Sequence, residues 1–118
     1  MSLYFANYQD FIRKKENPKA SEMLWGILNN QAWILGKLLF GVDVNSHTKV
    51  LDVLGRILTV EGANMTRNIA DANTIHRNFF HDILSDPDFQ IYKKSVEELI
   101  DKLDNILTKK LKQEGYLS

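Results

Sequence analysis

The apolar residues that follow Pro87 recur every three or four positions toward the end of the chain. They are Phe89, Tyr92, Val96, Leu99, Ile100, Leu103, Ile106, Leu107 and Leu111. This spacing places them on one stripe of an α-helix. Charged residues fill the other faces, and pairs such as Lys94 and Glu98 stand four apart, which supports a helix. The pattern predicts a long helix that Asp86 caps, that begins at Pro87 and that ends near Gly115.

Four more segments have the same helical period. The apolar residues predict helices over about residues 18–40, 47–60 and 64–84, and a shorter first helix in LYFANYQDFIRK. Ser46 or Asn45 can cap the helix that starts at His47. The connections are a few residues long, and no strand-like run competes with the helices. We therefore expect an all-α fold, an up-and-down bundle of four to five helices that forms a single domain over residues 1–118.

Composition limits the classes of function. The chain has 118 residues, 44% of them hydrophobic, which is enough for one core. Fifteen basic and fifteen acidic residues cancel, so binding to nucleic acid would need a local patch. The absence of cysteine excludes disulfides and thiolate metal sites and fits a cytoplasmic location. The most apolar segment, AWILGKLLFGV, is too short to span a membrane, so no membrane association is expected.

The segment IHRNFFHD, residues 75–82, carries two histidines, an arginine and an asparagine within a helical pattern. On a regular helix the core stripe would comprise Met65, Ile69, Ala72, His76, Phe79, Phe80 and Ile83. His76 would then lie at the centre of the stripe, whereas Arg77 and His81 would flank it, one turn apart. Asn73 would lie between His76 and Arg77. The pattern predicts a polar shoulder on an otherwise apolar helix.

Two interpretations of these residues stay open. In the first, His76 is buried and forms a structural hydrogen bond with Gln31, which lies on the apolar stripe of the second helix, or with a backbone group. In the second, Arg77 holds a phosphate and His81 exchanges protons, a pairing that suits phosphodiester cleavage. The alternative to the second interpretation is that Arg77 and His81 are solvated surface residues with no chemical role. His76 and His81 point apart, so no metal site is expected.

Two other features have simple structural explanations. The basic run RKKENPK, residues 13–19, is typical of a solvated helix terminus, although it could also contact nucleic-acid phosphates. Trp25 and Trp33 stand eight apart and share nearly one face of their helix. We expect them to anchor the core or an interface.

Four segments in order, KASEMLWGILNNQAWILGKL, SHTKVLDVL, ANTIHRNFFHDIL and SVEELIDKL, resemble the archaeal paREP family of small helical proteins. The resemblance covers about residues 18–103. Its most specific parts are Ala20-Ser21-Glu22, Leu24-Trp25-Gly26, Ser46-His47, Ala72, Ile75-His76 and Asn78-Phe79-Phe80. His76 and Asn78 correspond to the recurrent histidine and asparagine of the family.

The resemblance implies a HEPN-like bundle, of the class of nucleotide-binding helical domains that usually form homodimers. Some relatives accompany nucleotidyltransferases, and others are toxin ribonucleases. The ribonucleases carry arginine and histidine separated by four to six residues, whereas three residues separate Arg77 from His81 here. His81 also stands where the family more often has an acidic residue.

We therefore expect a non-enzymatic HEPN-like module that forms a homodimer and binds a nucleotide, RNA or a partner such as a nucleotidyltransferase. Asn73, His76 and Asn78 are its candidate binding residues, and no cofactor is expected. The alternative is a metal-independent ribonuclease that uses Arg77 and His81 as its catalytic residues.

Overall fold

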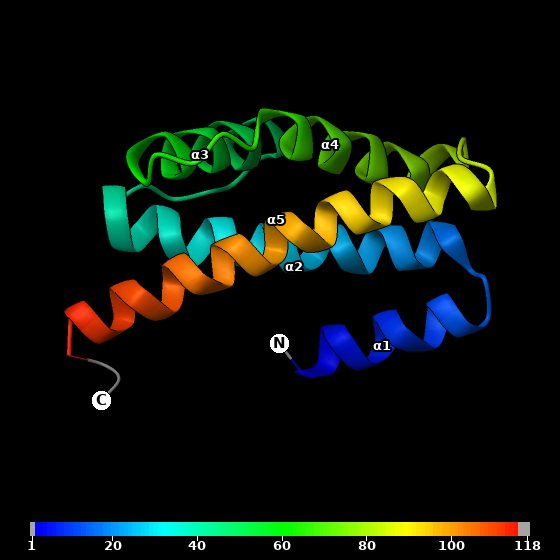
Figure 1. Ribbon diagram of the computed structural model, residues 1–118, viewed down its shortest axis with the longest axis horizontal. Coiled ribbons are helices and arrows are strands. Elements are labelled where there is room, and N and C mark those ends of the chain that lie inside the picture. The colour runs from blue at the N-terminus through cyan, green and yellow to red at the C-terminus, as the bar shows by residue number, and fades with distance from the viewer. Residues whose placement is uncertain (1, 116–118) are drawn as a thin grey trace.

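A computed structural model describes the backbone of residues 2–115 and the side chains of this range other than those of residues 2–7 and 80. The predicted core position Phe80 therefore lies outside the described side chains. Five helices make up the fold: α1 Ser2–Arg13, α2 Asn17–Phe40, α3 His47–Val60, α4 Thr66–His81 and α5 Asp86–Gln113 (Figure 1). The all-α bundle predicted from the sequence is confirmed, and the predicted helix over residues 47–60 has the observed bounds of α3.

Helix α2 is the centre of the bundle and contacts each of the other four helices. Its buried residues include Leu24, Ile27, Leu28 and Leu35, which follow the helical period. Helix α5 lies beside α2 and runs in the same direction, because Asn17 pairs with Asp86 near the start of both helices and Gln31 reaches Ile100 farther along (Figure 1). Helices α1 and α4 run the opposite way.

Helix α3 breaks the alternation of directions, because it runs parallel to α2. The ring of His47 at the start of α3 lies against Trp25, and Arg56 near its end lies over the ring of Phe40. Residues 41–46 make this possible by running back along α2 without helical structure. In this segment Val42 and Val44 pack on the core, while Gly41, Asp43, Asn45 and Ser46 are exposed.

The helix starts follow local capping chemistry. Ser46 caps α3, as the sequence predicted, by accepting a hydrogen bond from the backbone N–H of Lys49 at 3.2 Å. Ser85, rather than the predicted Asp86, caps α5 by accepting from the backbone N–H of Asp88. Asp86 instead accepts a hydrogen bond from Asn17 at 3.0 Å, which ties the starts of α2 and α5 together.

The face that α4 presents to the core agrees only in part with the predicted one. Ala72 is buried and Met65 and Ile69 pack against the core, as predicted. Ile75 and Asn78 are also buried among the described side chains of α4, whereas His76 is half-buried and Ile83 is exposed. The helix ends at His81 rather than near residue 84, because Asp82 adopts a left-handed conformation with a φ of 47°. The predicted stripe continued through Ile83, which lies beyond the end of the helix, and it omitted Ile75, which is fully buried.

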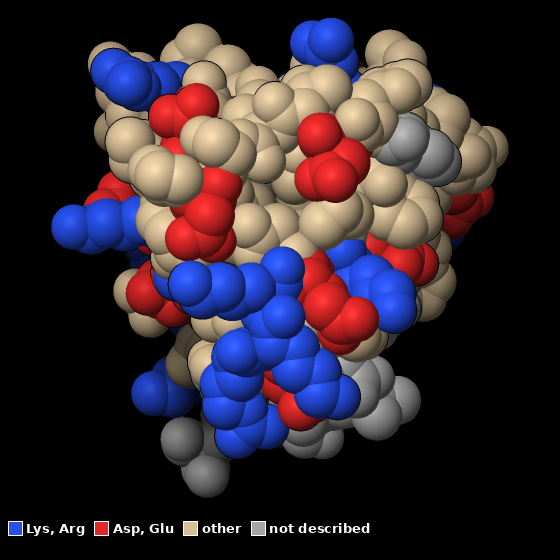
Figure 2. Space-filling model, turned by 90° about the vertical axis from the view of Figure 1, so that its right-hand side faces the viewer, with Lys and Arg blue, Asp and Glu red and all other residues tan. Residues whose placement is uncertain are grey.

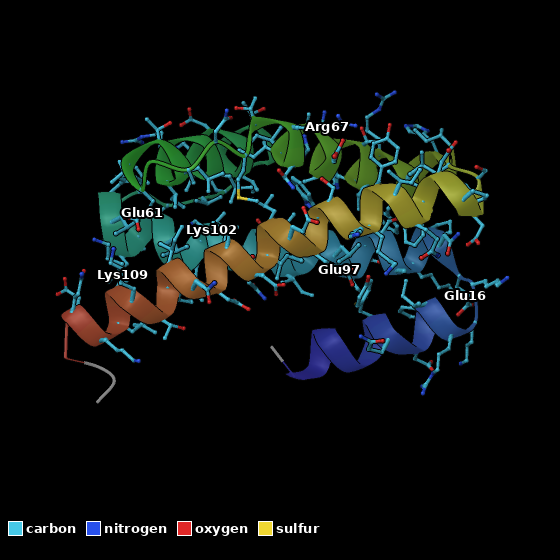
Figure 3. The ribbon with its side chains drawn as sticks, viewed as in Figure 1. Glu16, Glu61, Arg67, Glu97, Lys102 and Lys109 are labelled. Carbon is cyan, nitrogen blue, oxygen red and sulfur yellow. The ribbon has the colours of Figure 1, made fainter. Side chains whose placement is uncertain are left out.

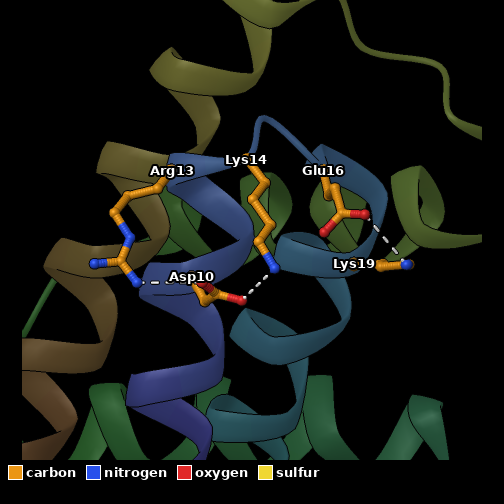
Figure 4. Close-up of polar contacts among 5 residues, drawn as sticks. All are labelled: Asp10, Arg13, Lys14, Glu16 and Lys19. Carbon is orange, nitrogen blue, oxygen red and sulfur yellow. Dashed lines mark hydrogen bonds and ion pairs between the residues drawn. The ribbon is translucent and has the colours of Figure 1, made fainter.

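Lysine and arginine side chains gather at the end of the molecule where α1 meets α2 (Figure 2). The exposed basic residues of this turn are Arg13, Lys14, Lys15 and Lys19. Asp10 pairs with both Arg13 and Lys14, and Glu16 pairs with Lys19, at 3.0 to 3.3 Å (Figure 4). The two cations beside Asp10, with Lys14 the stronger influence, lower the pKa of its carboxyl. The acidic neighbours thus offset much of the local positive charge.

None of the helices in the described part of the chain is long and apolar enough to cross a membrane.

Candidate functional site

Three aromatic rings from three different helices meet on one side of α2. The ring centroids of Trp25 in α2, His47 in α3 and His76 in α4 are 4.3 to 4.8 Å apart in every pairing. The two imidazole rings stack with an interplanar angle of 21°. The parallel course of α3 is what brings His47 to the level of Trp25. We call these three residues the ring cluster.

Asn73 fixes the orientation of His47. The Nε2 atom of His47 lies 3.0 Å from Oδ1 of Asn73, one turn before His76 on α4. Because an amide oxygen can only accept, Nε2 of His47 is the donor. Its Nδ1 atom is buried and has no hydrogen-bond partner among the described residues. One nitrogen of His47 is thus buried and the other is bonded to Asn73, so this imidazole is poorly placed for proton transfer.

The ring cluster borders a pocket with a volume of about 370 Å³. The pocket is lined by Trp25, Asn29, Val44, Asn45, Ser46, His47, Val50 and His76. Its lining combines aromatic faces with two amides and a hydroxyl, and it includes no aspartate, glutamate, lysine or arginine. A planar group with hydrogen-bonding edges suits such a lining. The first residues of α3 also lie at this pocket, so the positive end of the α3 dipole is close by.

The environment of His76 favours its uncharged imidazole. Burial, and then the proximity of His47, lower the pKa of His76 below its ordinary value. Two imidazolium rings in a stack would repel each other, and burial penalises a single charge. Neutral rings stack well on indole and on other heterocycles. His76 therefore presents a neutral aromatic ring at neutral pH.

Asn78, a predicted binding residue, is fully buried and satisfies its amide inside the protein. Its Nδ2 donates to Oγ of Ser21 at 3.1 Å, and its Oδ1 accepts from the backbone N–H of Leu84 at 2.9 Å. Ser21 in turn donates to the backbone oxygen of Asn17. These bonds hold the chain that leaves α4 against α2. In this arrangement Asn78 joins helices and is not exposed to a ligand.

Arg77 and His81 are both exposed on α4, one turn apart, as the shoulder interpretation expected. Neither residue lines the pocket beside the ring cluster. His76 and Asn73, in contrast, both belong to the ring cluster or contact it. Of the predicted site residues, only His76 and Asn73 therefore lie at the ring cluster, and Asn78, Arg77 and His81 do not line its pocket.

Gln31 does not pair with His76. Its Nε2 donates to the backbone oxygen of Ile100 at 3.0 Å and to Oδ1 of Asp104 at 2.7 Å, both in α5. The two residues lie on different sides of α2, because Gln31 faces α5 whereas the ring cluster lies between α2, α3 and α4. The predicted bond between Gln31 and His76 is wrong for this reason.

Sequence reasoning did not select Trp25 or His47 as site residues. Both belong to the most specific parts of the resemblance, Leu24-Trp25-Gly26 and Ser46-His47, as does His76. Three of those parts therefore converge in space. The aromatic and imidazole side chains that these segments contain are the sequence signal that could have identified the site.

The described residues include no group of three or more histidine or acidic side chains that could hold a metal ion. Comparison of the chain with protein-family models, with curated proteins and with solved structures finds no match. The family assignment thus stays a prediction from the sequence segments given above.

Proposed function

We propose that this protein is a non-enzymatic, HEPN-like module that binds a nucleotide in the pocket beside the ring cluster. The observation that carries the proposal is the meeting of Trp25, His47 and His76 at the edge of a pocket that has no charged lining. Aromatic and imidazole faces bind nucleobases by stacking, and the contribution is about 1 to 3 kcal/mol per base.

The polar groups of the pocket are suited to the edge of a base and to a phosphate. The side-chain amides of Asn29 and Asn45 can donate to and accept from the edge of a base. Ser46 and His47 begin α3, where backbone N–H groups and the helix dipole favour a phosphate. A nucleotide carries both a flat heterocycle and an anion, so it matches both parts of the pocket.

Three of the four imidazole nitrogens of the ring cluster are buried or already bonded, which favours binding over catalysis at this site. The Nδ1 atoms of His47 and His76 are both buried, and Nε2 of His47 is bonded to Asn73. General acid–base catalysis needs a nitrogen within hydrogen-bond reach of the substrate. The exposed pair Arg77 and His81 is the basis of the alternative ribonuclease function, which stays a separate proposal.

The fluorescence of Trp25 gives a direct test. In a Trp33→Phe background, Trp25 is the one remaining tryptophan. We expect AMP to quench its emission saturably, adenosine to bind more weakly, and ribose 5-phosphate to bind weakest because it lacks the base. His47→Ala and His76→Ala should each weaken AMP binding by about tenfold or more, given the energy of one stacked base.

His81→Ala is the matched control, because it removes an imidazole from the same helix but outside the pocket lining. Its affinity for AMP should equal that of the parent. The proposal fails if AMP causes no saturable quenching, or if all three histidine variants bind AMP as the parent does.

We further propose that the protein forms a homodimer through the exposed apolar surface of α2. Trp33 is 55% exposed and Ile34 is 39% exposed, and both line a shallow groove with Lys37, Leu38 and Leu111. Exposed tryptophan is enriched at protein interfaces. In sedimentation analysis Trp33→Ser should weaken a dimer, whereas Val60→Ser, at an exposed apolar residue of α3, should not. A monomer at high concentration would contradict the proposal.

A further inference from the structure

A second pocket lies between α4 and α5 and shares no lining residue with the pocket beside the ring cluster. Its volume is about 380 Å³, which is in the range of small-molecule sites. Figure 3 shows Arg67, one of its residues, near the start of α4, on the stretch of α4 that lies beside α5. The lining combines two cations, two carboxylates, an amide, a hydroxyl and one apolar side chain: Arg67, Asn68 and Asp71 from α4, and Ile91, Lys94, Ser95 and Glu98 from α5.

The charged side chains of this pocket form no ion pair with one another or with any other residue that the structure describes. Each helix supplies one cation and one carboxylate four residues apart, a spacing at which opposite charges can meet. Lys94 and Glu98 do not pair, although Lys93 and Glu97, with the same spacing one residue earlier on α5, pair at 3.2 Å. The pocket thus has charges of both signs on its walls that are free to contact a ligand.

Two side chains fix the orientation of Asp71. Ser95 donates from its Oγ to Oδ2 of Asp71 at 2.6 Å. Asn68 donates from its Nδ2 to the Oγ of Ser95 at 3.1 Å and to the backbone oxygen of Ser95 at 2.9 Å. The single hydroxyl proton of Ser95 is therefore committed to Asp71. Oδ1 of Asp71 accepts no hydrogen bond from the described residues, so the pocket holds an oriented carboxylate with one oxygen available.

The other groups of the lining complement this carboxylate. A guanidinium such as that of Arg67 can bind a ligand carboxylate through two parallel hydrogen bonds, and Lys94 adds a second positive charge. Ile91 is 64% exposed and offers apolar contact surface. A simple cation or a simple anion would be attracted by two of the charges and repelled by the other two. A small molecule with one charge of each sign and an apolar part matches the whole lining.

We propose that this pocket binds a free α-amino acid with an aliphatic side chain. The ammonium group of the ligand donates to Asp71 and Glu98, and its carboxylate accepts from Arg67 and Lys94. The aliphatic side chain contacts Ile91. All of the polar contacts are charge-assisted hydrogen bonds, which are about twice as strong as neutral ones. The site does not depend on nucleotide binding, because the two pockets are separate.

L-Leucine is the probe, and calorimetry measures its dissociation constant. We expect L-leucine to bind saturably and to raise the melting temperature. Isoamylamine lacks the carboxylate and 4-methylpentanoate lacks the ammonium group, so each should bind at least about tenfold more weakly. Glycine keeps both charges but has no side chain, and it should also bind more weakly than L-leucine. The proposal is overturned if L-leucine does not bind, or if any of the three analogues binds as tightly.

Variants locate the binding site. Arg67→Gln and Asp71→Asn should each weaken L-leucine binding by about tenfold or more, because each removes a charge that the ligand contacts. Arg67 is exposed, so Arg67→Gln tests the site even if Asp71→Asn unfolds. Asp52→Asn is the matched control, because it removes an exposed carboxylate of α3 outside the pocket lining, and its affinity should equal that of the parent. Equal affinity in Arg67→Gln and the parent would overturn the proposal.

Discussion

The imidazole of His47 stacks on the imidazole of His76 with ring centroids 4.5 Å apart, and Trp25 contacts both rings. The two histidines come from α3 and α4, and both line the pocket beside the ring cluster. Because burial and the second ring both disfavour a proton on His76, the stack ties the stability of the fold to pH.

The lowered pKa of His76 predicts a loss of stability in mild acid. The unfolded chain takes up a proton near the ordinary imidazole value, about 6.5, whereas folded His76 does so only at lower pH. Between these two values the unfolded state binds more protons, so the free energy of unfolding falls as pH falls. Thermal melts at pH 7.5 and pH 5.5 should show a lower melting temperature at pH 5.5.

His76→Phe keeps an aromatic ring in the stack but removes the titrating group, so its melting temperature should change less between the two pH values. The carboxyls of Asp10 and Asp86 have lowered pKa values, owing chiefly to hydrogen bonds from Lys14 and Asn17 respectively. Their contribution to stability is lost only below about pH 4, outside this window. An identical pH response in His76→Phe and the parent would show that His76 is not the cause.

Asn78 should be essential for stability. Asn78→Ala leaves the backbone N–H of Leu84 without its partner and removes the hydrogen bond that the Ser21 hydroxyl accepts, at a cost of about 1 to 3 kcal/mol or more. Chemical denaturation measures the change in the free energy of unfolding. Asn30→Ala, at an exposed position of α2, is the control and should change it by less than about 0.5 kcal/mol. A tolerated Asn78→Ala would count against the structural role of this buried amide.

Two helical glycines should respond differently to alanine. A Cβ at Gly55 meets nothing within 4 Å, so Gly55→Ala should stabilise the protein by about 1 kcal/mol through helix propensity. At Gly36 the same atom lies 3.2 Å from side-chain carbons of both Val44 and Val53. Crowding there should cancel or reverse the gain. Denaturant melts of both variants should differ by at least about 1 kcal/mol, and equal stabilisation would contradict the close packing at Gly36.

The ribonuclease alternative makes a distinct prediction. If Arg77 and His81 cut RNA without a metal ion, cleavage should persist in EDTA. Arg77→Ala and His81→Ala should each reduce the rate of cleavage by about 100-fold or more, which is the range expected for an acid–base group. Both residues are exposed, so neither change should lower the melting temperature. RNA digestion assays measure the rate, and His47→Ala serves as a comparison that changes the ring cluster and leaves Arg77 and His81 intact. Activity that survives in either of the first two variants would rule this mechanism out.

Helix positions could be predicted from sequence wherever the signal is local. The bounds of α3 follow from Ser46 as a cap and from the period of Val50, Leu54 and Ile57, all within a few turns. The end of α4 could not be predicted in the same way. It depends on Asp82 in a left-handed conformation and on Asn78, whose amide reaches both Ser21 and Leu84.

The candidate site was predicted in part. Asn73 and His76 were selected as binding residues from one short segment, and both belong to the ring cluster or contact it. His47 was not selected because nothing in the sequence shows that residues 41–46 run back along α2. A connection of that length also permits the usual antiparallel turn.

The sequence by itself determined the all-α class, the five helices and most of their apolar faces, because helical periodicity and capping act over one or two turns. Only the tertiary structure decided which helices are parallel and which polar residues meet. Val44 and Val53 pack closely on Gly36 of α2, α3 runs parallel to α2, and Trp25, His47 and His76 meet on one side of α2. That meeting depends on packing between distant segments, which no local pattern of residues specifies.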